Sequence, residues 1–334
     1  MSTERIWRDI RGLRADPPGR AGEEDDRREV FVAALQQAEE LHGAASVSGF
    51  ASRPLPLFYS LSQGGRAIAA AQGLGAGWAF HGHGLGVASE QEGDAVLAKE
   101  VEPHKKGAFP LLSEITGSAP LPGRLSLGAM LASLPEVASI VEAHVDDIPA
   151  LELSLDHETA NGEYMMLAPP LRMAAVYFGP ETSLSGERQL QAMETRLASY
   201  PRAKGWVIRP TQAQRNGKLG IGLRWPVEEG GARGGKALDV VATRYGPTYY
   251  LRPGLGEDGS EINVLMTWWA SLFTLSSLAR YEPALWGAAL DLNSSKLAVV
   301  LEEILEVAQE RVPELLYEVL TEERSLQIAA LESG

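Results

Sequence analysis

Residues 261–286 read EINVLMTWWASLFTLSSLARYEPALW, and this stretch decides the fold. With successive residues placed about 100° apart, its large apolar side chains share one broad arc of a helix. They are Leu265, Met266, Trp268, Trp269, Leu272, Phe273 and Leu275. Two tryptophans and a phenylalanine carry more apolar surface than an exposed helix leaves in water. We therefore predict that this helix is interior and that most of its domain packs around it.

Arg280 projects from the same arc, and Pro283 keeps the helix from running much further. A cation on the apolar face of a helix end needs a partner, so we expect a carboxylate or a backbone carbonyl to hold its guanidinium. That contact would lock the helix to the next element. The alternative is that Arg280 and Tyr281 reach an anionic ligand in a cleft. Arg66 and His83 would line the same cleft.

The composition bounds the class of protein. The 334 residues include 30 basic and 44 acidic side chains, a net charge of −14, and no cysteine. Such a charge disfavours nonspecific binding to nucleic acid or to an anionic membrane, although a local basic groove is compatible with it. The missing cysteines exclude disulfides and thiolate metal sites. With no signal peptide and no apolar run of about eighteen residues, we expect a soluble, cytoplasmic protein.

The spacing of apolar residues predicts an α+β protein, predominantly helical and bundle-like, with an inserted, mostly antiparallel β-rich segment. We divide the chain into an N-terminal segment, an N-terminal helical part, a β-rich central part and C-terminal helices that pack back on the first helical part. Their ranges are 1–22, 23–145, 146–263 and 264–330.

Within these parts we expect helices at residues 25–45, from Pro54 onward, and at 125–144, where Pro135 divides the helix and Ser126 caps it. A further helix is expected at 187–200. The other predicted elements are a loop at 16–22, a basic turn at 104–107 between two extended pieces, and a final pair of helices divided at Pro313.

The helix from Pro54 carries two features of its own. Gly64 and Gly65 each cost about 1 kcal/mol relative to alanine in a helix, which indicates close approach of another helix or backbone. On the other side, Tyr59, Gln63 and Arg66 form a polar stripe. The stripe is either a solvated face or the lining of a cleft.

Two histidines and a basic turn could carry chemistry. His81 and His83 are two residues apart in a glycine-rich loop, but two ligands do not make a metal site, so we predict no metal and no cofactor. Either imidazole could instead bond backbone, or act with Arg66 as an acid-base group. Lys105, in the turn at 104–107, is a candidate phosphate contact, unless the turn is merely solvated. A looser basic stretch, residues 202–218, suits either single-stranded RNA or strand edges.

Several segments together resemble the YaaC-like family of bacterial proteins. They are PLPLFYSLSQGGRA, the HGL beginning at His83, EVEPHKKGAF, LSLGAMLASLPEV, and LSSLARYEPALW followed by VPELLYEVL. They occur in the family's order, from about residue 30 to 320. The resemblance implies a cytoplasmic protein and no established activity. The helix pattern is more distantly similar to HEPN domains, many of which are ribonucleases or RNA-binding partners. Their nuclease motif, an Arg followed four to six residues later by a His, is absent.

Two functions are compatible with these observations. The first is a non-catalytic binding or regulatory protein that recognises RNA, a nucleotide or a protein partner, as a homodimer built on its large apolar helices. The second is a divergent HEPN-like ribonuclease or another phosphate-directed enzyme, with a role in phage defence as one setting. The candidate catalytic residues are Arg66, His81 and His83. The candidate ligand-binding residues are Tyr59, Gln63, Arg66, His83, Lys105, Arg280 and Tyr281.

Overall fold

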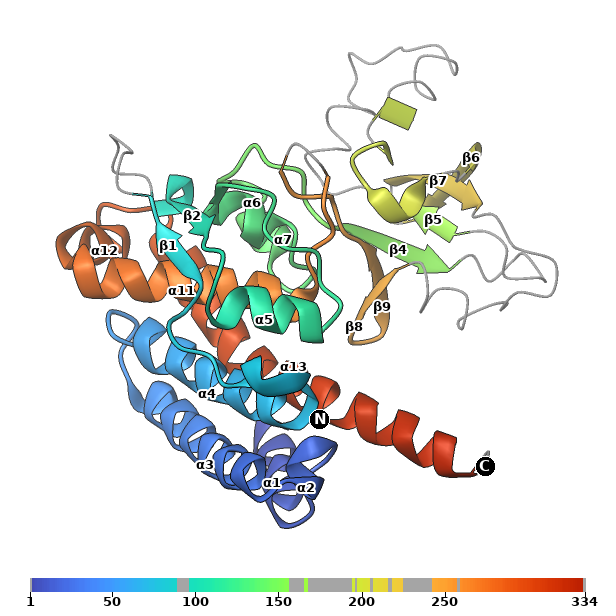
Figure 1. Cartoon of the computed structure of the whole chain (residues 1–334). Helices are drawn as coiled ribbons and strands as arrows, with labels where there is room; N and C mark the ends of the chain where they lie inside the picture. The colour runs from blue at the N-terminus through green and yellow to red at the C-terminus, as the bar shows by residue number, and fades with distance from the viewer. Residues whose placement is uncertain are drawn as a thin grey trace. The chain divides into compact units, whose positions relative to one another are not determined.

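The computed structural model describes residues 2–88, 96–155, 165–167, 194–195, 197–204, 207–215, 218–224, 242–256 and 259–332. The chain divides into two compact units, one of Met1–Met130 with Ile262–Gly334 and one of Leu131–Glu261 (Figure 1). The prediction of a predominantly helical α+β chain with an inserted antiparallel β-rich segment is confirmed. The four-part division stays a prediction. Within the described residues, no helix is both long and apolar enough to cross a membrane.

The first unit contains helices and one small antiparallel sheet, in the strand order β1-β2-β3. Its α-helices are α1 (Thr3–Ala15), α2 (Arg20–Glu23), α3 (Asp25–Val47), α4 (Pro54–Gln72), α5 (Ala108–Ile115), α11 (Val264–Tyr281), α12 (Pro283–Ala289) and α13 (Ala298–Glu332). Its strands are β1 (Leu85–Val87), β2 (Glu100–Pro103) and β3 (Leu125–Ser126), and its 3₁₀ turns are η1 (Gly75–Trp78) and η2 (Val96–Ala98).

Helix α11 is interior, as its apolar arc predicts. Trp268, Trp269 and Leu272 are fully buried. The opposite, polar face is buried as well. Its hydroxyl groups tolerate burial because each donates to a carbonyl of the preceding turn of the same helix. Ser271 donates to Thr267 at 2.9 Å, for example. The helix ends at Tyr281, and Pro283 starts α12, as expected.

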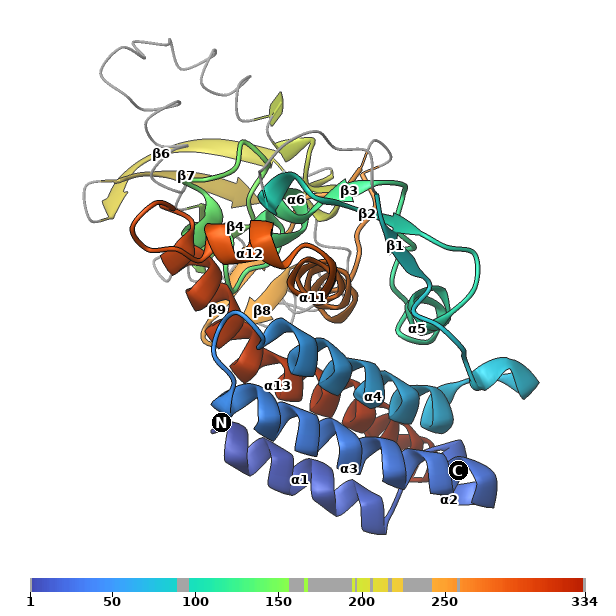
Figure 2. The same cartoon turned by 90° about the vertical axis from the view of Figure 1, so that its left-hand side faces the viewer.

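Helix α4 packs against α3, α5, α11 and α13 (Figure 2). A Cβ added at Gly64 would lie 2.4 Å from a side-chain methyl of Leu316 on α13. One added at Gly65 would lie 2.6 Å from the ring of Trp269 on α11 and 2.7 Å from Leu112 on α5. The predicted close approach at this glycine pair is therefore confirmed, and the pair lets α4 contact three helices closely.

Pro313 does not divide a helical pair: α13 runs through it as one helix, so that prediction is wrong. A proline has no N–H, and Pro313 therefore leaves the carbonyl of Gln309 without its donor inside the helix. The Nε2 of His42, on α3, lies 2.7 Å from that carbonyl oxygen. The other ring nitrogen, Nδ1, accepts from the indole N–H of Trp7 on α1 at 3.1 Å. This pairing assigns a neutral His42 with its proton on Nε2, which replaces the missing donor.

Two segments predicted to be irregular or extended are helical. The predicted loop at 16–22 includes the start of α2, which follows α1, where Ile6, Trp7 and Ile10 are buried. The piece after the basic turn is α5 and not extended backbone. Its Ala108, Phe109 and Leu112 are buried at helical spacing, a signal too short to separate from a strand by period alone.

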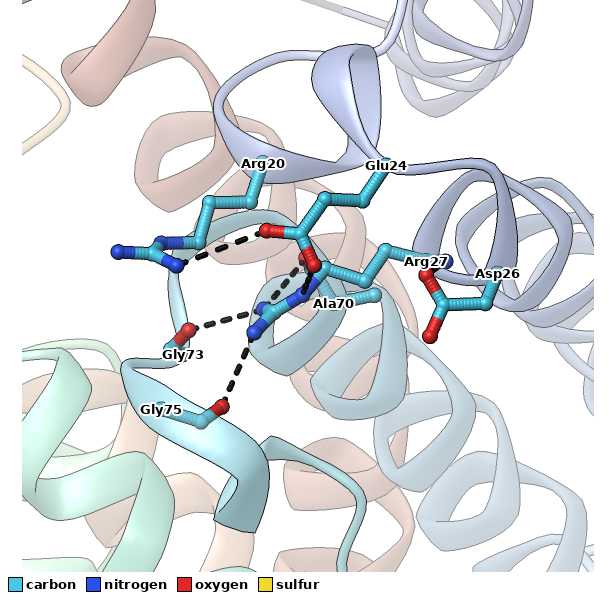
Figure 3. A network of polar contacts seen from close by, with 7 residues as sticks. All are labelled: Arg20, Glu24, Asp26, Arg27, Ala70, Gly73 and Gly75. Carbon is cyan, nitrogen blue, oxygen red and sulfur yellow. Dashed lines mark hydrogen bonds and ion pairs between the residues drawn. The ribbon is translucent and has the colours of Figure 1, made fainter.

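Helix α3 carries a buried cation near its start. Arg27 is 2% exposed, and its guanidinium donates to the carbonyls of Ala70 at 3.2 Å, Gly73 at 2.8 Å and Gly75 at 3.1 Å (Figure 3). Its Nε pairs with Glu24 at 2.9 Å. Arg27 therefore caps the carboxyl end of α4, where the last carbonyls of a helix lack partners.

The second unit is built on a six-stranded antiparallel sheet, in the order β6-β7-β5-β4-β9-β8. Its elements are α6 (Leu127–Ala132, which begins in the first unit), α7 (Ala138–Val141), β4 (Leu151–Leu155), β5 (Met165–Leu167), η3 (Pro201–Ala203), β6 (Val207–Arg215), β7 (Lys218–Arg224), β8 (Thr243–Tyr245) and β9 (Thr248–Leu251). Ser126 caps α6 as predicted, accepting from the N–H of Ala129 at 3.0 Å, and the break at Pro135 is confirmed. Most of the predicted helix at 187–200, and most side chains of the basic stretch at 202–218, lie outside the described residues.

Candidate functional site

The candidate site is built on a loop before β1 that carries His83. Three backbone hydrogen bonds join this loop to the turn that begins at His104 and to the start of α5. The N–H of His104 donates to Gly84 at 2.9 Å, that of Ala108 to Gly82 at 3.1 Å, and that of Phe109 to His83 at 2.9 Å. The loop and the basic turn therefore form one fixed unit.

Two glycines make this junction possible. Gly84 and Gly107 have φ values of 75° and 123°, conformations that residues with a Cβ rarely adopt. A Cβ added at Gly107 would lie 2.4 Å from the backbone nitrogen of Gly84, and backbone cannot move aside as a side chain does. The position of Lys105 and Lys106 relative to His83 thus depends on glycine at 107.

The imidazole of His83 is half-buried among aromatic rings. Its centroid lies 5.1 Å from that of Phe58 and 6.2 Å from that of Tyr59, both on α4, and 5.7 Å from that of Phe273 on α11. Burial lowers the pKa of His83, and the positive charges of Arg66 and Arg280 lower it further. The ring is therefore neutral at pH 7, with one nitrogen that donates and one that accepts.

Two guanidinium groups flank this histidine. Arg66 donates to the carbonyl of Phe80 at 3.4 Å and lies 4.7 Å from the centre of its ring. Arg280 donates to the Tyr59 hydroxyl at 3.4 Å and lies 5.0 Å from the centre of the Tyr281 ring. Within the part of the chain that the structure describes, neither arginine has a carboxylate within 4.0 Å. Each keeps several N–H donors for a ligand.

The structure corrects the expectation that a carboxylate or carbonyl holds a buried Arg280. The side chain is exposed, and its hydrogen-bond partner is the Tyr59 hydroxyl. Arg280 does share the helix face of Phe273, seven residues earlier, but it lies beyond the end of the packed core. The period of a helix predicts the direction of a side chain and not how far the core extends along the axis.

Two described carboxylates, one next to α11 and one on β2, are engaged by other cations. Glu282, which follows α11, pairs with the nearly buried Lys99 at 2.7 Å. Glu102 on β2 pairs with Arg124 at 3.1 Å. Arg66 and Arg280 form a cationic pair beside His83, in a chain whose net charge is −14.

The remaining candidates are less closely tied to this cluster. Gln63 is half-buried on the same face of α4 as Tyr59 and Arg66. His81 and Lys105 are exposed, and so is Tyr281, at 69%. Over the described ranges, no three His, Cys, Asp or Glu side chains gather as a metal site would require.

The rings of Phe58, Phe80 and Phe273 complete the cluster, and sequence reasoning did not assign them to the site. Phe273 was assigned to the core; both Phe58 and Phe273 are buried, and each also contacts His83 with its ring. Phe80 lies in an irregular, glycine-rich loop directly before His81, so no helical or strand periodicity predicted its contact with Arg66.

A sequence model of the YaaC-like protein family matches residues 14–320, most of the chain. The chain belongs to the YaaC-like family. The segments that suggested this family include those that carry Tyr59, Arg66, His83, Lys105 and Arg280. No curated protein and no solved structure matches the chain. The more distant similarity to HEPN domains stays a prediction.

Proposed function

We propose that this YaaC-like protein is a non-catalytic, cytoplasmic binding or regulatory protein that recognises a phosphate-bearing ligand, a nucleotide or RNA. The binding site is the cluster of Tyr59, Arg66, His83 and Arg280. One observation carries the proposal: two guanidinium groups without a carboxylate partner in the described residues flank a half-buried, neutral histidine.

A phosphate matches these donors in both geometry and charge. Guanidinium groups bind phosphate oxygens in pairs of parallel hydrogen bonds, and such charge-assisted bonds are stronger than neutral ones. The Tyr59 hydroxyl and one nitrogen of neutral His83 add further donors. Phe58 and Phe273 exclude water from one side of the imidazole, which strengthens the field that a bound anion experiences.

The test is calorimetric binding of adenosine 5′-monophosphate, guanosine 5′-monophosphate and a single-stranded RNA to the full chain. Arg66→Ala and Arg280→Ala should each weaken binding about 10- to 100-fold, the value of one charge-assisted contact. The matched control is Arg8→Ala, because Arg8 is exposed on α1 and its removal changes the net charge equally. If all three variants bind alike, or none of the probes binds the wild type, the proposal is wrong.

A phosphate-directed enzyme, including a divergent HEPN-like ribonuclease in phage defence, is the second candidate. The neutral imidazole of His83 favours it, since a neutral ring nitrogen beside two cations can accept a proton from an attacking hydroxyl. It predicts hydrolysis of RNA or nucleotide that His83→Gln abolishes while nucleotide binding remains. The alternatives of a protein partner and of a homodimer stay predictions, and sedimentation of the purified chain tests the second.

A further inference from the structure

A second set of cations lies beside the proposed phosphate site. Lys105 and Lys106 are exposed, and neither forms an ion pair with any side chain that the structure describes. A Cβ added at Gly107, which follows Lys106, would lie 3.1 Å from the carbonyl carbon of His83. The three backbone hydrogen bonds that join the loop to the basic turn therefore hold the lysine pair close to the His83 backbone.

An exposed aromatic ring lies beside Arg280, one of the two arginines of the site. Tyr281 is 69% exposed at the last residue of α11, with the Arg280 guanidinium 5.0 Å from its ring centre. A large ring left in water beside an arginine is the arrangement on which nucleic-acid bases stack. The ion pair of Glu282 with Lys99 ties this end of α11 to the residue before β2.

The two sets of cations lie on different elements and are close enough for one short strand to contact both. Lys99 pairs with Glu282, two residues after Arg280, and Lys105 follows Lys99 by six residues, which span at most about 20 Å. A mononucleotide has one compact phosphate group, whereas a strand of a few nucleotides presents phosphates and bases in succession. We propose that the site binds single-stranded nucleic acid. Arg66 and Arg280 contact one phosphate, Lys105 and Lys106 a neighbouring one, and Tyr281 stacks on a base.

This inference rests on the proposed function and narrows its ligand to a polymer. A duplex is excluded by the stacking contact, because its bases are already stacked on one another. RNA and DNA share the phosphodiester chemistry that the described residues recognise, so both strands belong in the test. A polymer also makes binding steeply dependent on salt, since each phosphate contact releases counterions.

The experiment measures fluorescence anisotropy of labelled strands of about 12 nucleotides, within the range of known single-strand sites, at about 50 to 200 mM salt. The probes are RNA, DNA of the same sequence, duplex RNA, and adenosine 5′-monophosphate as competitor. We expect one or both single strands to bind at least about ten-fold more tightly than the duplex and the mononucleotide. Lys105→Ala/Lys106→Ala should reduce the slope of log affinity against log salt by about 1.4, or 0.7 for each contact.

Matched controls separate these contacts from bulk charge. Arg8→Ala/Lys296→Ala removes two exposed cations elsewhere and should leave the slope unchanged. Tyr281→Ala should weaken binding about ten-fold without changing the slope, and Tyr281→Phe should keep the affinity, because either ring can stack.

The inference is overturned if the mononucleotide binds as tightly as the strands, or if the lysine and tyrosine variants bind as the wild type does. The proposed function survives that result when mononucleotide binding still depends on Arg66 and Arg280. Strand binding that ignores both arginines overturns the proposed function and this inference together. If no probe binds, the proposed function and this inference are also both overturned, and a protein partner remains as the alternative ligand.

Discussion

Replacing His42 by Phe removes the donor that the proline in α13 makes necessary. In the folded chain the His42 ring lies between Trp7 and the carbonyl of Gln309, and that carbonyl has no helix donor because Pro313 lacks an N–H. Phenylalanine keeps most of the volume of the ring and neither of its nitrogens. The variant therefore leaves the Gln309 carbonyl and the Trp7 indole N–H without these partners.

The expected cost follows from those two groups. A buried polar group that loses its partner costs about 1 to 3 kcal/mol, so His42→Phe should reduce the free energy of unfolding by about 2 to 5 kcal/mol. In a Pro313→Ala background the alanine N–H can donate to the carbonyl of Gln309 and replace the lost bond. There the same substitution should cost about 1 to 3 kcal/mol less, because only the Trp7 group remains unsatisfied.

The assay is urea unfolding of the four proteins of this double-mutant cycle, followed by tryptophan fluorescence. The control cycle replaces His42→Phe by Gln36→Ala, an exposed position on the same helix, and should be additive. If the His42 and Pro313 substitutions are additive within about 0.5 kcal/mol, the reasoning that the histidine replaces the donor missing at the proline is refuted.

Three further predictions concern stability. Burial lowers the pKa of His42, and its hydrogen bond to a backbone carbonyl opposes this shift, so the unfolded chain binds a proton more readily than the folded chain does. The contribution of His42 to stability should therefore be full above about pH 6.5 and be lost as the pH drops through the pKa of the folded state. Urea unfolding at a series of pH values measures this dependence, and His42→Phe should flatten it. Gly65→Ala should destabilise the protein by about 1 kcal/mol, since a clash of about 2 kcal/mol with Trp269 exceeds the gain in helix propensity. The control Gly43→Ala, whose added Cβ has nothing within 4 Å, should stabilise the protein by up to about 1 kcal/mol. Thermal melts measure both shifts, and equal shifts would contradict the close packing at Gly65. Arg27→Met should lower the free energy of unfolding by about 3 kcal/mol, because buried carbonyls at the end of α4 lose their donor. A loss below about 1 kcal/mol in urea unfolding would show that water replaces the guanidinium as donor.

Burial and close packing were predicted correctly for the two helices, α11 and α4, whose own residues require them. The two tryptophans of α11 require burial wherever the helix lies, so its interior position followed from the sequence. The glycine pair of α4 likewise indicated a close neighbour, though not that Leu316 and Trp269 would provide it.

The errors arose where a distant residue overrides a local rule. Pro313 ends a helix by local reasoning, but His42, which is 267 residues from Gln309 along the chain, satisfies the freed carbonyl. Arg27 stands in a run of charged residues at the start of α3, and it is buried because the end of α4 lies against it. A single sequence contains no signal of these long-range contacts.

The candidate site was partly predictable for the same reason. Helical spacing placed Tyr59 and Arg66 on one face of α4, and the structure brings His83 and Arg280 to that face. The missing partner of Arg280 could not be foreseen, because whether a carboxylate lies nearby depends on how α11 meets the other elements.

The central claim is that Arg66 and Arg280 form one phosphate site. Calorimetric titration of inorganic pyrophosphate into the wild type, the two single alanine variants and the double variant tests it most directly. The account predicts binding at low salt, and single-variant losses whose sum exceeds the loss in the double variant, because one phosphate group contacts both arginines. Losses that add independently, or a double variant that binds as the wild type does, would contradict it.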